Sequence, residues 1–527
     1  MKKVLLVVTL FFNFCLFSEA QFKYVASGPS FDEPQKGTSK LVLMKDGAVI
    51  FFTIIPKDGI DIRVYSKDHK EIAATIIVPS SSELRAPSLQ AAFEINRDMV
   101  LLISEIQDKT PVLYRIIIDG STGKLKKEEK IGELKKVSLG QGYAMAFGGV
   151  DSPGFYASKD PDSENYAVSL FNSFESDRNK RIEIVHYNSG HQEISRGYYS
   201  SPDDKYKYLD FLSMAVIGTE KVSVMVSGYN TAATGGKSSE VLLANLENGA
   251  SSFSFTELNF PKDSLLENGI VHYNPAIKKF VVIAKMYANK GEKEAQMYLA
   301  FVDPYSKKTE RLIVTGISQK IADKAADIYG RKYKYSGTPV NLHINKDGSF
   351  SIVYEATVKV SGSSSTYAGA SSYGVTQGIV TAAYDKNGEI TSNYMVPKNF
   401  MLDKPGYVMR SISFRNEYKK FAYINCGEKS YVLINDTERN IELIEKNKEP
   451  VIVQGVDECD AFYFPLTGSE AIPQRKYLFG DPENKREHNR ALLDISAYDK
   501  ENDLFVVLQL QKEGRGKTVN LVWLKPQ

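Results

Sequence analysis

The stretch NLHINKDGSFSIVYEATVKV, from Asn341 to Val360, shows the pattern that decides the fold. A short apolar segment is followed by Asn-Lys-Asp-Gly and then by a longer run of β-branched and aromatic residues. Runs of this kind, bounded by turn residues, are typical of β-strands. The Asp-Gly pair supplies the left-handed backbone that a tight hairpin needs. The stretch therefore predicts a short strand, a turn and a long buried strand.

The same unit recurs along the chain. Comparable long runs occur at Ala48–Ile55, Met99–Ile106, Lys221–Tyr229, Phe280–Tyr287 and Leu504–Gln511. With a second strand pair after each, the units begin near Leu41, Ala91, Phe155, Leu209, Ile270, Val340, Met409 and Leu492. Units of about 50–80 residues with four antiparallel strands are typical of a β-propeller. We therefore expect an all-β fold, a single propeller of seven or eight four-stranded blades over residues 21–527.

Three of the six histidines stand in similar settings: IVHYNSG from Ile184, IVHYNPA from Ile270 and NLHINKDG from Asn341. Such a set could be a scattered metal site, a group of catalytic bases or the trace of a repeat. The separations of about 86 and 71 residues match whole blades rather than a chelating motif. We interpret these histidines as marking the repeat. The strand pair after His186 resembles an outer hairpin, and the pair after His272 resembles an inner one.

The first residues have the features of a signal peptide. Lys2 and Lys3 precede an apolar run from Val4 to Phe17, and Ser18-Glu19-Ala20 presents small residues where a signal peptidase cuts. The run of about 14 residues is shorter than the roughly 18–20 that a membrane span needs. We expect residues 1–20 to be removed, leaving an exported, periplasmic protein that begins at Gln21.

Export makes the two remaining cysteines, Cys426 and Cys459, candidates for a disulfide. A bridge closing this loop would stabilise the fold by roughly 3–4 kcal/mol in the chain-entropy model. The alternative is a pair of buried free thiols. Spacing alone does not decide between them, because a disulfide also needs its Cα atoms close together.

Composition and motifs exclude several classes of function. A net charge of +2 with mixed Lys and Glu runs gives no basic footprint for nucleic acid. The single tryptophan, Trp523, argues against sialidase-like and quinoprotein propellers, which use repeated tryptophans. Phosphate-binding, zinc-protease and serine-hydrolase motifs are absent from the sequence. We therefore assign no catalytic, cofactor-binding or metal-binding residue and expect no cofactor. Carboxylates from distant blades could still meet at the central funnel.

Two kinds of segment depart from the strand pattern. Ser318–Gly330 has a Ser N-cap, apolar residues at helical spacing and a closing Gly, which predicts a short helix on the rim between blades. Residues 227–239 and 361–378 are small and uncharged, which predicts long loops leaving the same face. Long loops without structure of their own are usually functional or disordered. The candidate partner-binding residues in the second loop are Ser361, Ser365, Tyr367, Tyr373 and Gln377.

In strand rhythm, export signal and Lys/Tyr-rich blades, the chain resembles exported β-propeller proteins. It also resembles, in size and strand content, the plug-like periplasmic subunit of the type IX secretion translocon. That resemblance implies a non-catalytic protein that binds an outer-membrane or secretion-apparatus partner, with a loop that could occlude a pore. The alternative is a glycan-active or glycan-binding propeller with a site in its central funnel.

The last segment, KTVNLVWLKPQ, has the pattern of a strand. A propeller ring closes when one blade takes strands from both ends of the chain. We therefore expect this segment to complete a blade together with the N-terminal segment, forming a non-covalent clasp.

Overall fold

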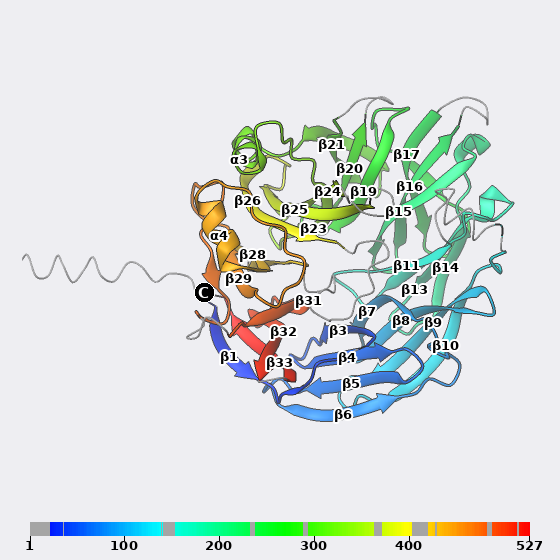
Figure 1. Ribbon diagram of the computed structural model, residues 1–527. Helices are drawn as coiled ribbons and strands as arrows, with labels where there is room; N and C mark the ends of the chain where they lie inside the picture. Colours follow the sequence, from blue (N-terminus) through cyan, green and yellow to red (C-terminus); the bar gives the residue numbers. More distant parts are fainter. Residues whose placement is uncertain are drawn as a thin grey trace, which may run out of the picture.

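The computed structural model describes residues 22–526 apart from 35, 139, 141–152, 232–237, 288–293, 363–370, 403–419, 427–428, 482–486 and 514–515. The expected signal peptide, residues 1–20, lies outside these residues. The described chain forms eight antiparallel sheets arranged as blades around a central axis (Figure 1). The expected all-β propeller is therefore confirmed, with eight blades.

Blades 1 to 7 each run from an inner first strand to an outer fourth strand in chain order, whereas the outer strand of blade 8 comes from the N-terminal end of the chain. Blades 1 to 4 consist of β3 (Thr38–Leu43), β4 (Val49–Ile55), β5 (Gly59–Tyr65) and β6 (Glu71–Ile77); β7 (Ser88–Ile95), β8 (Asp98–Gln107), β9 (Thr110–Asp119) and β10 (Leu125–Glu133); β11 (Gly154–Lys159), β12 (Tyr166–Phe171), β13 (Ile182–Tyr187) and β14 (Glu193–Tyr198); and β15 (Tyr208–Ile217), β16 (Lys221–Asn230), β17 (Ser238–Glu247) and β18 (Ser254–Glu257). The first strands of successive blades lie side by side around the axis.

Blades 5 to 8 complete the ring. They consist of β19 (Leu265–Asn274), β20 (Lys279–Tyr287), β21 (Gln296–Asp303) and β22 (Lys308–Thr315); β23 (Thr338–Ile344), β24 (Phe350–Gly362), β25 (Ser371–Tyr384) and β26 (Ile390–Met401); β27 (Ala422–Cys426), β28 (Lys429–Asp436), β29 (Asp460–Pro465) and β30 (Lys476–Tyr477); and β31 (Arg490–Asp499), β32 (Leu504–Glu513) and β33 (Gly516–Lys525) with β1 (Lys23–Ser27) and β2 (Phe31–Asp32). Seven of the eight expected unit starts fall on or beside a first strand, whereas Met409 lies outside the described residues.

The two ends of the chain meet in blade 8, as expected. Strand β1 pairs antiparallel with β33, with Lys23 opposite Lys525 and Ser27 opposite Val522 (Figure 1). Phe22, just before β1, is 5% exposed and packs against the rings of Tyr431 and Tyr463 in blade 7. The clasp therefore ties the N-terminal segment to the last two blades.

The core consists of apolar layers between neighbouring sheets. One cluster joins blade 1 to blade 2, and another joins blade 8 to blade 1 around the buried ring of Trp523. The middle strands supply most of these side chains because they are covered on both faces, as the burial of β8 and β9 shows. A single sheet cannot bury both of its faces, which is why the blades must stack around a closed ring.

Two α-helices of the described residues lie on the outer rim (Figure 1). The predicted helix is α3 (Gln319–Tyr329), which buries Ile321, Ala325 and Ile328 against blades 5 and 6. The second, α4 (Glu438–Glu445), was not predicted, although Thr437 caps it by accepting a hydrogen bond from Asn440 N. Two 3-10 turns, η1 (Arg178–Lys180) and η2 (Pro202–Asp204), precede strands β13 and β15.

The prediction of long loops at 227–239 and 361–378 was wrong in extent. Strand β16 continues to Asn230 and β17 begins at Ser238, while β24 and β25 pair from Phe350–Tyr384 out to Gly362–Ser371. Small uncharged residues such as Ser, Thr and Tyr suit a two-stranded ribbon whenever each strand supplies a partner for the other. Both segments join second and third strands, so they do leave the ring on the same face.

The three histidine motifs are not equivalent positions of one repeat. His186 lies in β13, a third strand, whereas His272 and His343 lie in the first strands β19 and β23. The His186 ring is fully buried, and its Nε2 lies 3.0 Å from the carbonyl oxygen of Gly218 in blade 4. The inference that the His186 motif begins an outer hairpin and the His272 motif an inner one is confirmed.

Removal of residues from Thr518 onward is expected to destabilise the whole ring, because β33 pairs with both β32 and β1.

A milder test of the clasp is Phe22→Ala. This substitution should lower the free energy of unfolding by about 3–5 kcal/mol, because a large buried ring is lost. The matched control is Tyr24→Ala, at a side chain that is 58% exposed. Thermal and urea melting would measure both, and unchanged melting of the truncated protein would rule out the clasp.

A second prediction concerns Asp436, the last residue of β28, whose side chain is fully buried. Its Oδ1 accepts hydrogen bonds from Thr437 N and Asn440 Nδ2, both at 2.8 Å, while Oδ2 has no hydrogen-bond partner among the described residues. Burial raises the pKa of this carboxyl from 3.8 to about 7. The folded state therefore holds the proton more tightly than the unfolded chain does.

Because the pKa of Asp436 is higher in the folded state than in the unfolded chain, its protonation stabilises the folded state. This stabilisation is fully present below about pH 4 and is lost as the pH rises through 7. Asp436→Asn should remove this component, so the variant should lose less stability than the wild type between pH 5 and pH 8.5. Asp347→Asn is the control, because hydrogen bonds from Ser349 lower the pKa of Asp347, so this carboxyl is ionised in both states over this pH range and its removal should leave the pH dependence of stability unchanged. Equal urea-melting profiles for Asp436→Asn and the wild type would contradict the prediction.

Candidate binding funnel

A cavity of about 500 Å³ lies at the hub, where first strands of several blades end. Residues from blades 3, 4, 5, 6 and 8 line it: Ser158, Lys159, Pro161, Asp162, Met214, Ala215, Val216, Val271, His272, Tyr273, Pro275, Leu342, His343, Ile344, Asn345, Lys346, Lys500 and Glu501. We call this cavity the funnel. Its wall is the apolar end of each first strand, and its mouth is the polar turn that follows.

Two histidines lie in the funnel wall. His272 in β19 and His343 in β23 belong to neighbouring first strands that lie side by side. Burial lowers the pKa of each imidazole to about 4, and the charge of Lys500 contributes at His343. Both rings are therefore uncharged at neutral pH. The His343 ring packs on the ring of Tyr423 in β27, with centroids 4.6 Å apart.

Three lysines contribute to the funnel. Lys159 donates hydrogen bonds to the carbonyl oxygens of Ser163, at 2.6 Å, and Asp160, at 3.3 Å. Lys346 and Lys500 stand in the turns after β23 and β31 and are exposed at the mouth. Burial first, and then the neighbouring charge of Lys346, lower the pKa of Lys500. Within the described chain neither Lys346 nor Lys500 makes an ion pair.

Two carboxylates, Asp162 and Glu501, complete the ionisable lining. Burial and the nearby charge of Asp160 raise the pKa of Asp162. Burial likewise raises the pKa of the Tyr273 phenol to about 12. With both histidines neutral, the lining carries three cations and two anions, which gives it a formal charge of +1. Such an arrangement can hold an anion by charge-assisted hydrogen bonds.

The two lysines at the mouth share one feature of the sequence, their position in the turn after a first strand. Lys346 and Lys500 occupy the same place in the turns NKDG and DKEND, each directly after the Asn or Asp that ends a first strand. The sequence pattern of NKDG predicts a hairpin turn but does not show which other turn lies beside it. The two turns meet at one axis only because the blades close into a ring, and the sequence of either turn does not show this.

The partner-binding residues predicted from sequence do not form one loop. Ser361 pairs with Ser372 and Tyr373 with Val360 in the β24–β25 ribbon. Gln377 was wrongly placed in a loop, because it lies within β25 with its side chain 8% exposed and its Nε2 3.5 Å from Asn399 Oδ1. Ser365 and Tyr367 lie outside the described residues.

Cys426 and Cys459 are free thiols in the structure. Cys459 is buried in the apolar layer between blades 8 and 1, while Cys426 borders the layer between blades 7 and 8. Burial raises the pKa of Cys426 to about 11 and raises that of Cys459 as well. Of the two alternatives that the sequence left open, the structure has the free thiols.

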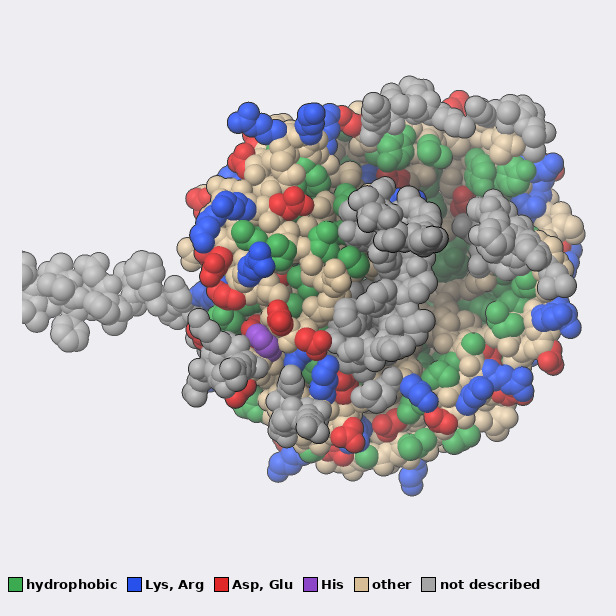
Figure 2. Space-filling view, in the orientation of Figure 1, with side chains coloured by type: hydrophobic (Ala, Val, Ile, Leu, Met, Phe, Trp, Pro, Cys, Tyr) green, Lys and Arg blue, Asp and Glu red, His purple; other side chains and the backbone are tan. Residues whose placement is uncertain are grey.

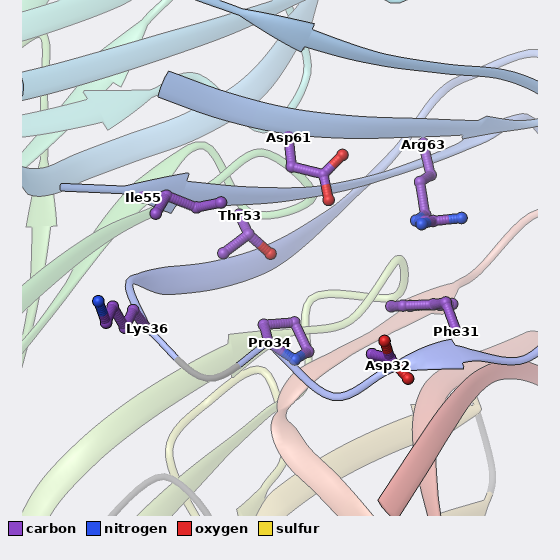
Figure 3. A pocket seen from close by; sticks show the side chains of 8 residues that line it. All are labelled: Phe31, Asp32, Pro34, Lys36, Thr53, Ile55, Asp61 and Arg63. Atoms are coloured by element: carbon purple, nitrogen blue, oxygen red, sulfur yellow. The ribbon is translucent and has the colours of Figure 1, made fainter. Parts of the chain in front are cut away.

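Another cavity, of about 590 Å³, lies at the seam between blades 8 and 1. Figure 3 shows its lining, in which Asp61 and Arg63 of β5 face the segment that carries Phe31 and Asp32. The Arg63 guanidinium lies 4.3 Å from the centre of the Phe31 ring and pairs with Glu71 at 3.2 Å. The Arg63 guanidinium is therefore already engaged within the seam between the two blades.

The remaining described residues were compared with three other kinds of site: a charged surface patch, a metal centre and a membrane-spanning helix. Acidic and basic side chains are interspersed around the rim of the face in Figure 2. Among the described residues, no three His, Cys, Asp or Glu side chains gather as a metal site would require. In the same part of the chain, no helix has both the length and the apolar character needed to cross a membrane.

No family model matches the chain, and no curated protein matches it. Among solved structures it is similar to polysaccharide lyase Uly1, with 11% identity and a TM-score of 0.37 over 86% of this chain and 92% of that one. It is also similar to a prolyl endopeptidase, with 11% identity and a TM-score of 0.39 over 94% of this chain, but it spans only 55% of that protein. The N-terminal domain of Nup159 has 9% identity and a TM-score of 0.31 over 96% of both chains. At such values, function must be argued from this chain's own residues.

The free thiols lead to a labelling prediction. Protein beginning at Gln21, unfolded in guanidinium without reductant, should take up two alkyl groups from iodoacetamide, because neither cysteine is bridged. The folded protein should react slowly at pH 7.5, since burial disfavours both thiolates. Intact-mass spectrometry would count the labels. A protein that gains labels only after reduction would instead contain the disulfide.

Proposed function

We propose that this protein is a non-catalytic binding protein that holds an anionic ligand in the funnel. The observation that carries the proposal is the lysine pair at the mouth. Lys346 and Lys500 lie close enough for one charge to disfavour the other, and neither has an ion-pair partner in the described chain. An anion between them would relieve this repulsion and gain charge-assisted hydrogen bonds.

The wall beneath the lysines suits a ligand with a polar edge and an apolar face. Val271, Leu342 and Ile344 supply apolar contacts, while Asn345 and Ser158 supply polar ones. The neutral imidazoles can each donate one hydrogen bond and accept another. His343 Nε2 is buried and has no hydrogen-bond partner among the described residues, so a ligand would satisfy it.

The test is calorimetric titration with galacturonate, a carboxylate probe, against galactose as its uncharged counterpart. The double variant Lys346→Met/Lys500→Met should bind galacturonate at least about tenfold more weakly, because charge-assisted hydrogen bonds contribute about 1.5–3 kcal/mol each. Lys308→Met, at an exposed lysine on the outer strand β22, is the matched control. Equal affinity for galactose, or undiminished binding by the double variant, would overturn the proposal.

A second candidate function is binding of an outer-membrane or secretion-apparatus protein after export. It is favoured by the β24–β25 ribbon, whose strands of 13 and 14 residues exceed the second and third strands of every other blade. A projecting ribbon can add to a partner's sheet edge. In this function the ribbon, with its tip, would be the element that enters a pore.

The ribbon can be shortened without disturbing its register. Replacing residues 360–373 by Asn-Gly would join Lys359 to Gly374, which face each other in the sheet, through a tight turn. We expect the shortened protein to melt like the wild type and to lose its partner in affinity purification from detergent-solubilised envelopes. Retention of the same partner at wild-type yield would exclude the ribbon as the contact.

A further inference from the structure

A second cavity lies beside the funnel, between blades 6 and 7. It has a volume of about 370 Å³, and Asn345 belongs to its lining as well as to that of the funnel. Its other lining residues come from the turn after β23, the start of β24, the end of β25, the start of β26, strand β27, the start of β28 and the segment after β29. These strand ends and the turns at the funnel mouth lie on one face of the ring. We call this cavity the interblade cleft.

Two side-chain contacts separate the cleft from the funnel. The ring of His343, which lines the funnel, lies 4.6 Å from that of Tyr423, which lines the cleft. Asn425 Nδ2 donates a hydrogen bond of 2.9 Å to Asn345 Oδ1. A ligand in the funnel would therefore be in reach of the polar groups of the cleft.

The chemistry of the cleft differs from that of the funnel. Its lining contains hydroxyl groups from Ser349, Ser351, Thr381, Ser392 and Ser430, with the rings of Tyr384 and Tyr394. Neither lysine nor arginine lies among its lining residues. Its carboxylates are occupied by their own turns, since Asp347 Oδ1 accepts from Ser349 N at 3.0 Å and Asp385 Oδ1 from Asn387 N at 2.9 Å.

One hydroxyl in the cleft lacks a partner. Thr381 Oγ1 is buried and makes no hydrogen bond to any described residue. A buried polar group left unpaired costs about 1–3 kcal/mol, so a ligand that pairs with it gains affinity. Hydroxyl-rich linings with aromatic rings suit molecules that carry many hydroxyl groups on a ring, whereas the funnel lysines suit a carboxylate.

We infer that the funnel and the interblade cleft form one extended site for an acidic oligosaccharide. The carboxylate of one sugar lies between Lys346 and Lys500, and a neighbouring sugar occupies the cleft against Thr381. This inference rests on the anion site proposed above and names the class of its ligand. It predicts that affinity rises with the length of the oligosaccharide.

The test compares trigalacturonate with galacturonate by calorimetry. The trimer should bind the wild type at least about tenfold more tightly than the monomer. Thr391→Trp, at an exposed position on the cleft, should remove this gain and leave monomer binding unchanged. Thr309→Trp is the matched control, because Thr309 is the second residue of β22 as Thr391 is of β26.

A smaller change guards against misfolding of the tryptophan variant. Thr381→Val should weaken binding of the trimer severalfold and leave monomer binding unchanged, with a melting temperature no lower than that of the wild type, because the variant removes an unpaired buried hydroxyl. If the trimer binds no better than the monomer, or if Thr391→Trp and Thr381→Val bind it like the wild type, the extended site is wrong while the anion site stands. Equal affinity for a triglutamate peptide would also overturn the inference, since it would show that only charge is recognised. Failure of both galacturonates to bind would remove the anion site as well.

Discussion

Every blade of this protein has two apolar faces, and that constraint determines the rest of the structure. The middle strands β8 and β9 are buried along nearly their whole length, so each sheet must be covered on both sides. A sheet at the end of an open row would leave one such face in water, at roughly 25 cal/mol for each Å² of apolar surface. Closing the row into a ring removes both ends. The pairing of β1 with β33 makes that closure with main-chain hydrogen bonds from opposite ends of the chain.

The funnel follows from this closure. A ring of blades brings the ends of the first strands to the axis, and those strands end in turns because each must reverse into its second strand. Tight turns favour Asn, Asp and Gly, and the residues between them are carried to the hub whatever their chemistry. Lys346 in NKDG and Lys500 in DKEND reach the mouth in this way, and the histidines of β23 and β19 lie just below on the strand ends. The presence of two lysines at the mouth is thus a property of turn sequences that meet only when the ring is closed.

The parts of the structure that local sequence determines were predictable, and the parts that depend on contacts between distant blades were not. Alternation, turn residues and the terminal strand were enough for the blades and for the clasp, and Ser318 and Gly330 bounded the helix α3. The strand residues 361–362 and 371–378 were mistaken for part of a loop because each strand of the β24–β25 pair is stabilised by the other rather than by its own pattern. Lys346 and Lys500 line the same cavity because of the places that blades 6 and 8 take around the axis. No spacing along the chain contains that order.

The ionisation of the funnel side chains favours binding over acid–base chemistry. An effective general acid or base has a pKa near the working pH, yet burial holds the imidazoles of His272 and His343 near 4 and the phenol of Tyr273 near 12. At neutral pH the imidazoles are weak bases, and the phenol gives up its proton reluctantly. Burial keeps these three groups neutral at pH 7, so they can serve as hydrogen-bonding partners, and the charge of the site comes from its lysines and its two carboxylates. These ionisation states support the proposed binding function, in which the pocket would discriminate between ligands by charge and by hydrogen bonding.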